Sequence, residues 1–415
     1  MSERYDAIIG GGGPTGLTMA LTLAHTFGDD VRIAIVDPSE AAPSATGSSM
    51  NTAIVDPRAW ALSAASVRLL RSLGVWSDIE GHAQPVTEIE ITDSFLDAGI
   101  RPVLLSYDNQ TEAGEPAAHI VPNQALLDAL HHAVSMRANN AITGISGRSI
   151  SSFEAGATGA NVTLDDNSRH FSDLIIAADG RRSHLRETAG IKSIQWPYDQ
   201  RGIVTTVAYE RPHGGKAVQH FLPGGPFAML PLTGNRSCIT WSEDAAAADH
   251  IMSLEDTAFL AEIQRRFGGK LGRLELAGPR ASFPLSMHLA RSFVAPSLAL
   301  IGDAAHSVHP IAGQGLNLAF RDIAALSECI ADGARSGLSF GDFTVLERYQ
   351  SWRRFDSTLS AATFDAINRL FSNDITLLRS AREVGLGLVN RSSALKQYFV
   401  SEGAGLSGEV PKLMR

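Results

Sequence analysis

The chain opens with a short apolar run that predicts a buried strand. This run, Tyr5–Ile9, leads into four consecutive glycines, and a helical pattern of apolar residues begins at Pro14. A second apolar run, Val31–Val36, ends at Asp37. A strand, a helix and a strand within about 30 residues have the size of a βαβ crossover, so these residues predict two parallel strands joined by a helix.

Further strands and helices are predicted by the same two patterns. Between about residues 186 and 280, strand-like stretches are separated by Gly and Pro turns, which predicts a separate antiparallel sheet. From Gly315 the pattern returns to helices, which continue through the remaining residues without a flexible linker or an internal repeat. The predicted elements are strands at Glu88–Asp93, Asp173–Ala177, Ile203–Tyr209, Arg236–Trp241 and Leu298–Ile301, and helices at Asn123–Ala133 and Gly315–Ile330.

Composition narrows the class of protein. A chain of 415 residues with 44% hydrophobic and 19% charged residues predicts a globular protein of two or three domains. Its 35 Lys and Arg against 44 Asp and Glu give a net charge of −9, which argues against nucleic acid as a partner. With Cys238 and Cys329 as its two cysteines, we expect neither a disulfide framework nor a cysteine-rich zinc site, and both side chains are interpreted as small core fillers.

No targeting pattern stands out in the sequence. The N-terminus lacks a charged and then apolar leader, and no stretch approaches about 18 unbroken apolar residues. We therefore expect a chain that is neither secreted nor membrane-spanning by itself, in a reducing, cytoplasmic compartment.

The glycine run has the spacing of a dinucleotide phosphate cradle. It reads Gly11-Gly12-Gly13-Pro14-Thr15-Gly16, in which Gly11 makes the tight turn, Gly13 lets the backbone approach a pyrophosphate and Gly16 lets the helix pack on the strand. Asp37, 21 residues beyond Gly16, is placed to accept hydrogen bonds from ribose hydroxyls. A glycine-rich turn without a ligand is the alternative, and the motif does not separate FAD from NAD.

Two more signatures follow buried strands. They are Asp179–Arg186, reading DGRRSHLR, and the segment from Gly302 to Asp322, reading GDAAHSVHPIAGQGLNLAFRD. With the glycine cradle they resemble the three signatures of the single-component FAD-dependent aromatic hydroxylases, the p-hydroxybenzoate hydroxylase superfamily. The sequence of the last signature is similar to that of the ubiquinone-biosynthesis hydroxylases, the group that includes 2-octaprenyl-6-methoxyphenol hydroxylase. Asp56–Ser63 and Asn123–Leu127 also match that group, and the resemblance covers about residues 5–390.

This resemblance implies an α/β architecture of interleaved parts. We expect a Rossmann-like FAD-binding domain, a mostly antiparallel β substrate domain and C-terminal helices. The FAD-binding domain is assigned to residues 1–84, 117–185 and 281–345, the substrate domain to 85–116 and 186–280, and the C-terminal helical region to 346–415.

The resemblance also implies which residues bind FAD at its ribityl and adenosine side. Asp303, with Gly302 before it, is expected to bind ribityl hydroxyls, a helix N-cap being the alternative. Arg58 and Gln124 are expected near the pyrophosphate and ribose, with an exposed salt bridge as the alternative for Arg58. Asp179 reaches toward the cofactor in the family, but a helix cap or turn is nearly as good an interpretation.

The flavin ring is expected beside the last signature. Gly313 and Gly315 leave backbone bare there, and backbone N–H groups of Leu316 and Asn317 would face the pyrimidine edge, which becomes anionic on reduction. Pro310 would stiffen the loop that faces the ring.

The reaction implied is hydroxylation of the ring of a polyprenylated phenol in ubiquinone biosynthesis. NADPH or NADH would reduce FAD, O2 would add to give a C4a-hydroperoxide, and one oxygen atom would pass to the phenol. Because the flavin carries the hard step, the protein needs no catalytic side-chain set, and none stands out. His306 and His309 are interpreted as loop or packing residues, and no metal site is predicted.

The substrate pocket is expected between the flavin and the antiparallel sheet. Phe221, Phe227, Met229 and Pro231 are candidates for its apolar wall, although such a cluster is more often plain core. A hydroxylase of a soluble aromatic acid is a second interpretation, which would need a cation in the pocket. A flavin-bound subunit without turnover in a biosynthetic complex is a third.

A polyprenyl substrate would also require an apolar tunnel or contact with a membrane. Residues 346–415 carry ten Lys or Arg against seven Asp or Glu, a charge of +3 that is opposite in sign to the whole chain. We therefore hypothesise that this region touches the inner membrane surface or a ubiquinone-biosynthesis partner, with packing on the flavin domain as the alternative. The apolar stripe is Leu377, Ala381, Val384 and Leu388, beside Arg379 and Arg382.

Overall fold

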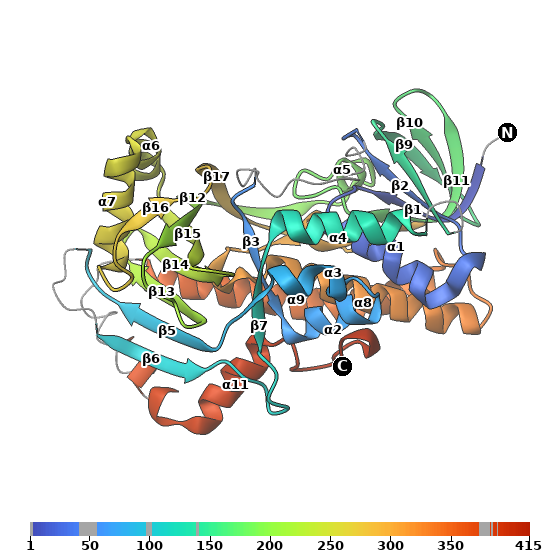
Figure 1. Cartoon of the computed structure of the whole chain (residues 1–415). Helices are drawn as coiled ribbons and strands as arrows, with labels where there is room; N and C mark the ends of the chain where they lie inside the picture. Colours follow the sequence, from blue (N-terminus) through green and yellow to red (C-terminus); the bar gives the residue numbers. More distant parts are fainter. Residues whose placement is uncertain are drawn as a thin grey trace.

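The structure, a computed structural model, describes residues 3–40, 56–96, 102–137, 141–372, 382, 385–387 and 389–415. Two large sheets lie side by side in it, and a long helix runs from one to the other (Figure 1). The expected α/β fold with a second, mostly antiparallel sheet is confirmed.

An eight-stranded sheet contains the amino-terminal strand. Its members are β1 (Glu3–Gly10), β2 (Ile33–Asp37), β8 (Ile142–Ser146), β9 (Ile150–Ala155), β10 (Ala160–Leu164), β11 (Arg169–Ala177), β18 (Val294–Ala295) and β19 (Leu298–Leu300). The order is β18-β19-β11-β1-β2-β8, with β10 and β9 joined beside β11. The strands from β19 to β8 in this order run parallel and read as apolar runs because both faces are covered.

Three helices pack together against this sheet. They are α1 (Pro14–Phe27), α4 (Asn123–Ser135) and α8 (Gly315–Arg335). Proline suits the first position of α1 because it has no N–H to leave unsatisfied, and α1 ends before Gly28, whose φ is +73°. Shorter helices surround this core at α2 (Ala64–Ser72), α3 (Trp76–Ile79) and α5 (His184–Thr188).

The second sheet has nine strands, nearly all antiparallel. They are β5 (Glu88–Asp93), β6 (Val103–Asp108), β12 (Ser193–Tyr209), β13 (Lys216–Leu222), β14 (Gly225–Leu232), β15 (Arg236–Asp244), β16 (Leu274–Leu276), β17 (Ala281–Ala290) and β20 (His306–Ser307). The order is β20-β17-β12-β15-β14-β13-β5-β6, with β16 beside β12. Because β17 pairs with β12, we propose that the substrate part extends beyond residue 280, to 290.

The two faces of the nine-stranded sheet have different partners. Helices α6 (Ala245–Ser253) and α7 (Asp256–Phe267) pack on one face, where Phe227 lies in one cluster with Phe259. The other face packs on a three-stranded sheet of β3 (Ala59–Ser63), β4 (Gln84–Pro85) and β7 (Ala118–Pro122). We call the face that packs on this three-stranded sheet the β3 face.

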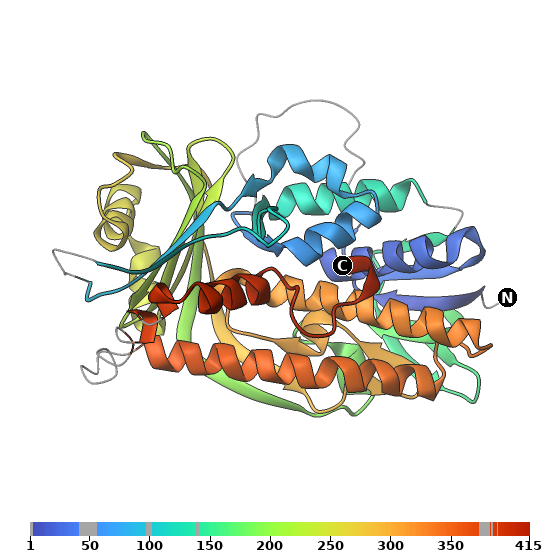
Figure 2. The same ribbon diagram turned by 90° about the horizontal axis from the view of Figure 1, so that it is seen from below.

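The C-terminal helices join the two halves. α9 (Phe343–Phe371) contacts α8 and β18 at one end and β14, β17 and β20 at the other. α11 (Ser393–Gly403), dark red in Figure 2, packs against β6 and the start of α2. None of the described helices is both long enough and apolar enough to cross a bilayer. Short 3₁₀ helices connect the elements at Gly28–Asp30, Glu80–His82, Gly302–Ala304, Ile311–Gly313 and Lys412–Met414.

Candidate active site

The turn between β1 and α1 admits only glycine at two positions. Gly11 has a φ of +116°, and a Cβ there would lie 2.4 Å from the carbonyl oxygen of Ala178. A Cβ on Gly16 would lie 1.9 Å from the carbonyl oxygen of Gly11, so α1 can approach β1 this closely only without a side chain. A Cβ on Gly13 would meet nothing within 4 Å. The open side of the turn is therefore at Gly13, where backbone can meet a ligand.

The start of α1 offers N–H groups at this open side. The first bond within the helix runs from the N–H of Leu17 to the carbonyl oxygen of Gly13, at 3.0 Å. No acidic residue stands in the first turn, and no side chain caps it. The N–H groups of Thr15 and Gly16 therefore have no partner within the helix, and with the helix dipole they attract a phosphate.

Asp37 holds the end of β2 against the glycine turn. One carboxylate oxygen accepts the N–H of Gly12 at 2.5 Å, and the other accepts the N–H of Ser39 at 2.8 Å. The carboxylate thus lies beside the turn, at the carboxyl end of the strand, where the sequence predicts a ribose.

Asp303 lies across from the start of α1. A Cβ on Gly302, whose φ is +56°, would lie 3.1 Å from the Thr15 Cγ2, which shows how closely this segment approaches α1. The Asp303 side chain is exposed, and no described residue donates a hydrogen bond to its carboxylate. The protein atoms around it nevertheless raise its pKa by desolvation. A carboxylate that a ligand can reach, and to which no described residue donates, suits a ligand with hydroxyl groups. The Asp303 carboxylate caps no described helix.

A buried charge cluster behind Asp303 is not predicted by the sequence patterns. Asp322 of α8 has no exposed surface and accepts hydrogen bonds from His306 Nε2 at 2.6 Å, Arg353 Nε at 2.8 Å and the N–H of Gly302 at 3.0 Å. Burial would raise the pKa of Asp322, but the charges of His306 and Arg353 outweigh it and lower the pKa. Asp322 thus fixes the backbone that presents Asp303.

The start of α8 forms the opposite end of the site. Gly313 has a φ of +63°, and a Cβ there would lie 3.0 Å from the Ala61 Cβ. The Asn317 side chain donates to the carbonyl oxygen of Ala61 at 2.8 Å and accepts the N–H of Ser63 at 2.9 Å, which ties α8 to β3. The first bond within α8 comes from Leu318, so the N–H groups of Leu316 and Asn317 have no partner within the helix. Pro310 precedes this segment directly.

Two residues expected near the pyrophosphate have local partners. The guanidinium of Arg58 pairs with Asp56 at 2.6 Å and is half exposed, so the salt-bridge alternative describes its contacts here. Asp56 in turn raises the pKa of Arg58 through this hydrogen bond. Gln124 donates to Asp128 one turn further along α4, at 2.8 Å. Binding of FAD by these two side chains stays a prediction.

Asp179 acts as a cap in this structure. Its carboxylate accepts the N–H of Leu185 in α5 at 3.1 Å, in agreement with the alternative considered for it. In the same segment the buried Arg186 donates to the carbonyl oxygen of Ala304 at 3.0 Å. The second signature therefore supports the backbone around Asp303.

The structure corrects the expected apolar wall of the pocket. Phe227 and Met229 lie in the core between the nine-stranded sheet and helices α6 and α7, on the face away from β3. Pro231, two residues further along β14, points to the same side of the sheet as Met229 and is buried. Phe221 is the exception, since it lies on the β3 face and stacks on Phe371 of α9 with ring centroids 4.1 Å apart.

Of the C-terminal stripe and its two arginines, the structure describes Arg382. Arg382 is buried and its Nε donates to Asp93 of β5 at 2.7 Å, so this guanidinium is not at a membrane surface. Leu377, Arg379, Ala381, Val384 and Leu388 lie outside the described residues.

His309 and the cysteines are core residues. His309 is buried edge-on against Tyr198, with ring centroids 5.1 Å apart, and burial lowers its pKa to about 4. Cys238 and Cys329 are free and buried, as expected of core fillers, and burial raises the pKa of each to about 12.

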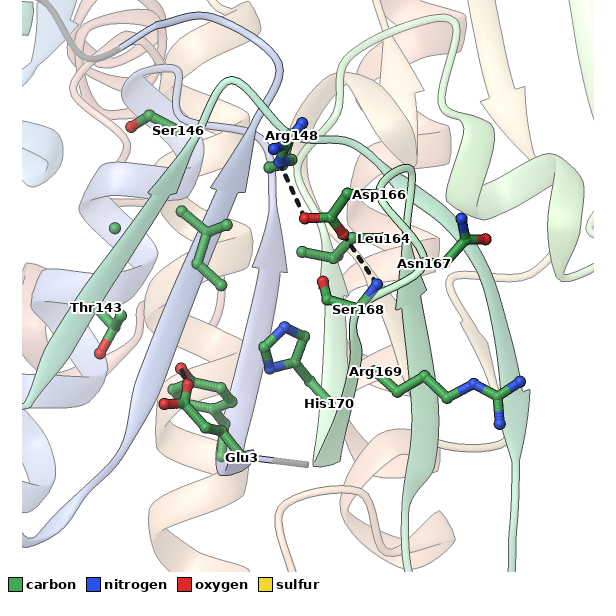
Figure 3. Close-up of a pocket in the computed structure, with 13 residues that line it drawn as sticks. Glu3, Thr143, Ser146, Arg148, Leu164, Asp166, Asn167, Ser168, Arg169 and His170 are labelled. Carbon is green, nitrogen blue, oxygen red and sulfur yellow. Dashed lines mark hydrogen bonds and ion pairs between the residues drawn. The ribbon is translucent and has the colours of Figure 1, made fainter. Parts of the chain in front are cut away.

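A separate groove lies along the edge strand β8. It has a volume of about 900 Å³ and runs between β8 and the turn from β10 to β11, where Arg148 pairs with Asp166 at 3.2 Å (Figure 3). None of the residues expected to bind the cofactor lines this groove. It is therefore not part of the cradle.

Three chain-distant segments thus converge on one elongated site. The helix starts at Gly13 and Gly315 carry backbone N–H groups without a partner within the helix. Two accessible carboxylates, Asp37 and Asp303, lie between these helix starts in the sequence. These donors and acceptors fit a dinucleotide whose phosphates lie at α1 and whose polyhydroxy chain passes Asp303.

Comparison with known proteins identifies the class that this fold and site define. Residues 4–355 match the family model described as FAD binding domain, and the chain belongs to that family. It is a flavoprotein of the aromatic monooxygenase class, and its cofactor is FAD.

Two relatives resemble almost the whole chain. The ubiquinone hydroxylase UbiL of Rhodospirillum rubrum is 39% identical over 413 residues, covering 99% of this chain and 92% of that protein. The 3-demethoxyubiquinol 3-hydroxylase of Escherichia coli is 32% identical over 415 residues, covering 98% of this chain and all of that protein. The crystal structure of p-nitrophenol 4-monooxygenase PnpA from Pseudomonas putida DLL-E4 superposes with a TM-score of 0.78 at 17% identity, covering 99% of this chain and 100% of that one, which supports the fold.

Proposed function

We propose that this protein hydroxylates the ring of a polyprenylated phenol in ubiquinone biosynthesis, with FAD, NAD(P)H and O2. The observation that carries the proposal is the accessible Asp303 carboxylate between two bare helix starts, in a chain whose full-length relatives are ubiquinone hydroxylases. Bound FAD would supply the redox chemistry that activates O2.

The residues of the cradle bind and orient the cofactor in this proposal. The N–H groups at the start of α1 hold the pyrophosphate, and Asp303 accepts hydrogen bonds from ribityl hydroxyls. The N–H groups of Leu316 and Asn317 would stabilise negative charge on the pyrimidine edge of the bound flavin. Pro310 and Gly313 would let the ring approach the backbone, since neither places a flexible side chain there.

The substrate ring is placed between the flavin and the β3 face. Side chains of that face, among them Ile91, Leu230 and Phe283, are partly exposed and mostly apolar, as a prenylated aromatic ring requires. Arg382, a buried cation in the described part of this region, is already paired with Asp93. This pairing favours a phenol over an aromatic acid, whose carboxylate needs a cation of its own.

A single-turnover experiment tests the function. Enzyme reduced anaerobically with NADH or NADPH is mixed with isotopically labelled O2 and a prenylated phenol, and the product is analysed by mass spectrometry. The proposal predicts a product that has gained one labelled oxygen atom. Flavin reoxidation that yields hydrogen peroxide alone with every prenylated phenol would contradict it.

We further propose that α9 contacts the membrane from which such a substrate is drawn. Phe355 is 75% and Leu359 56% exposed, one turn apart on the outer side of the helix, with the exposed Arg354 beside them. Apolar side chains next to a cation are typical of interfacial helices. This pair takes the place of the C-terminal stripe expected from the sequence.

Vesicle co-sedimentation tests the membrane contact. A Phe355→Glu, Leu359→Glu double variant is expected to lose binding to anionic phospholipid vesicles, because both charges would enter the apolar contact. Phe343→Glu replaces a phenylalanine that is 63% exposed at the start of α9, outside this pair, and should bind as wild type does. Equal partitioning of the double variant and wild type would rule the contact out.

A further inference from the structure

Gln219 is a polar residue on the apolar β3 face. It pairs with Ala228 of β14 and Ile91 of β5, and paired residues point to the same side of a sheet. Its chain neighbours Val218 and His220 point to the other side, where His220 lies against Phe227. The Gln219 amide therefore points toward the cofactor part of the molecule.

Two contacts locate Gln219 along that face. Ala217, two residues earlier, packs in one cluster with Ala61 of β3, the residue beside Gly313. Phe221, two residues later, stacks on Phe371 of α9. Gln219 thus lies between the strand that adjoins the flavin cradle and the helix that closes the far side.

The amide of Gln219 has no hydrogen-bond partner among the described residues. Its Nε2 is buried without a hydrogen bond, and no described residue bonds to its Oε1. A buried amide without a partner costs about 1–3 kcal/mol, so native proteins rarely keep one without a function. The paired residues around it, Ala228 and Ile91, are apolar and would accommodate leucine equally well.

We propose that Gln219 hydrogen-bonds a ring oxygen of the phenolic substrate and so determines which ring carbon faces the flavin. This inference rests on the proposed function. A carboxamide suits this role because it donates to a phenolate or ether oxygen through Nε2 and accepts a phenol hydroxyl through Oε1. A half-turn of the amide group exchanges the two atoms, so either protonation state of the phenol is bound. Gln219 is a specificity-determining residue in this account, and it takes no part in proton transfer.

Binding and product analysis of Gln219→Leu test the proposal. The variant should retain bound FAD and show no loss of thermal stability, since leucine removes an unsatisfied polar group from an apolar face. The Kd for a prenylated phenol, read from the change in flavin absorbance, should rise about tenfold, which corresponds to about 1.4 kcal/mol. Product per NAD(P)H consumed should fall, and hydroxylation should spread over more than one ring carbon. Gln219→Glu, which places a charge opposite the oxygen, should weaken binding further.

Two controls separate this contact from other effects. A prenylbenzene without ring oxygen should bind wild type and Gln219→Leu with the same Kd, because the contact is absent in both. Gln195→Leu, at an exposed glutamine on β12 of the same sheet, should behave as wild type does in every assay.

The outcomes distinguish this inference from the proposed function. If wild type hydroxylates the phenol, and Gln219→Leu matches it in Kd and in product position, the inference is wrong and the function stands. If wild type binds the phenol but never hydroxylates it, the function fails, while the same titration still decides the contact at Gln219. A lower thermal stability of Gln219→Leu with unchanged Kd would indicate a structural role and overturn the proposal.

Discussion

Substitution of Asp322 should destabilise the protein far more than loss of an ordinary ion pair. In Asp322→Asn the buried Arg353 loses its charged partner on α8 and keeps Asp356, which is partly exposed. Removing one member of a buried charge pair costs about 3–5 kcal/mol, because the other charge stays out of water. Gly302 and His306 also lose the carboxylate oxygen that both of them contact. We therefore expect a loss of about 3 kcal/mol or more, together with weaker FAD binding.

Urea unfolding of the FAD-free protein measures this cost, and Asp332→Asn is its control. Asp332 lies on the same helix and pairs with Arg335 and Arg348, whose side chains are 69% and 50% exposed. Exposed pairs contribute at most about 1 kcal/mol, so the control should lie close to wild type. An Asp322→Asn variant no less stable than Asp332→Asn would refute the reasoning.

The pH dependence of the Asp322 effect has a definite sign. The pKa of Asp322 is lowered in the folded protein, so its contribution is complete above the unfolded pKa of about 3.9 and is lost as the pH falls through the folded pKa. The stability difference between wild type and Asp322→Asn should therefore persist at about pH 5 and above and shrink below about pH 4. A difference that disappears near neutral pH would contradict this assignment.

Three more outcomes follow from the site. Asp303→Asn should deplete bound FAD but raise the thermal stability of the FAD-free protein at neutral pH, because desolvation raises the pKa of Asp303 and makes its ionised form unfavourable there; flavin content and calorimetry check both. Gly16→Ala should abolish FAD binding, because its Cβ would overlap the carbonyl oxygen of Gly11. Gly28→Ala is the control: its Cβ would meet no atom within 4 Å, but its φ is positive. This variant should lose only about 1 kcal/mol of stability in urea unfolding and retain FAD. Phe227→Ala should cost about 3–5 kcal/mol by leaving a cavity, yet leave the Kd of the remaining folded protein for the phenol unchanged in a flavin titration.

The phosphate cradle could be predicted from sequence because it is local. Gly11, Gly13 and Gly16 stand within six residues, and their roles follow from the backbone alone. The helix that follows them is equally local, since Pro14 and the apolar spacing define it.

The substrate side could not be predicted in the same way. Phe227 and Gln219 lie eight residues apart on adjacent strands, and their faces depend on which neighbours cover the sheet. Composition favours the phenylalanine as a pocket residue, whereas the packing of α6 and α7 buries it on the opposite side. Strand alternation shows that the two residues point to opposite faces only once the register of β13 and β14 is known.

The charge pairs could not be predicted because their partners are distant in sequence. Arg382 and Asp93 are separated by 289 residues, and Arg353 and Asp322 by 31 residues on two different helices. From the sequence, Arg382 is compatible with a membrane helix or with packing, and the buried carboxylate of Asp93 shows that this one side chain is packed.

Titration of the FAD-free protein with FAD tests whether three distant segments of the chain bind one cofactor together. We expect one FAD bound per chain without a covalent link, and a large loss of affinity from one substitution in each segment: Gly13→Val in the glycine turn, Asp303→Ala after β19, and Gly313→Val before α8. Wild-type protein that takes up no FAD, or three variants that bind FAD as tightly as wild type does, would contradict it.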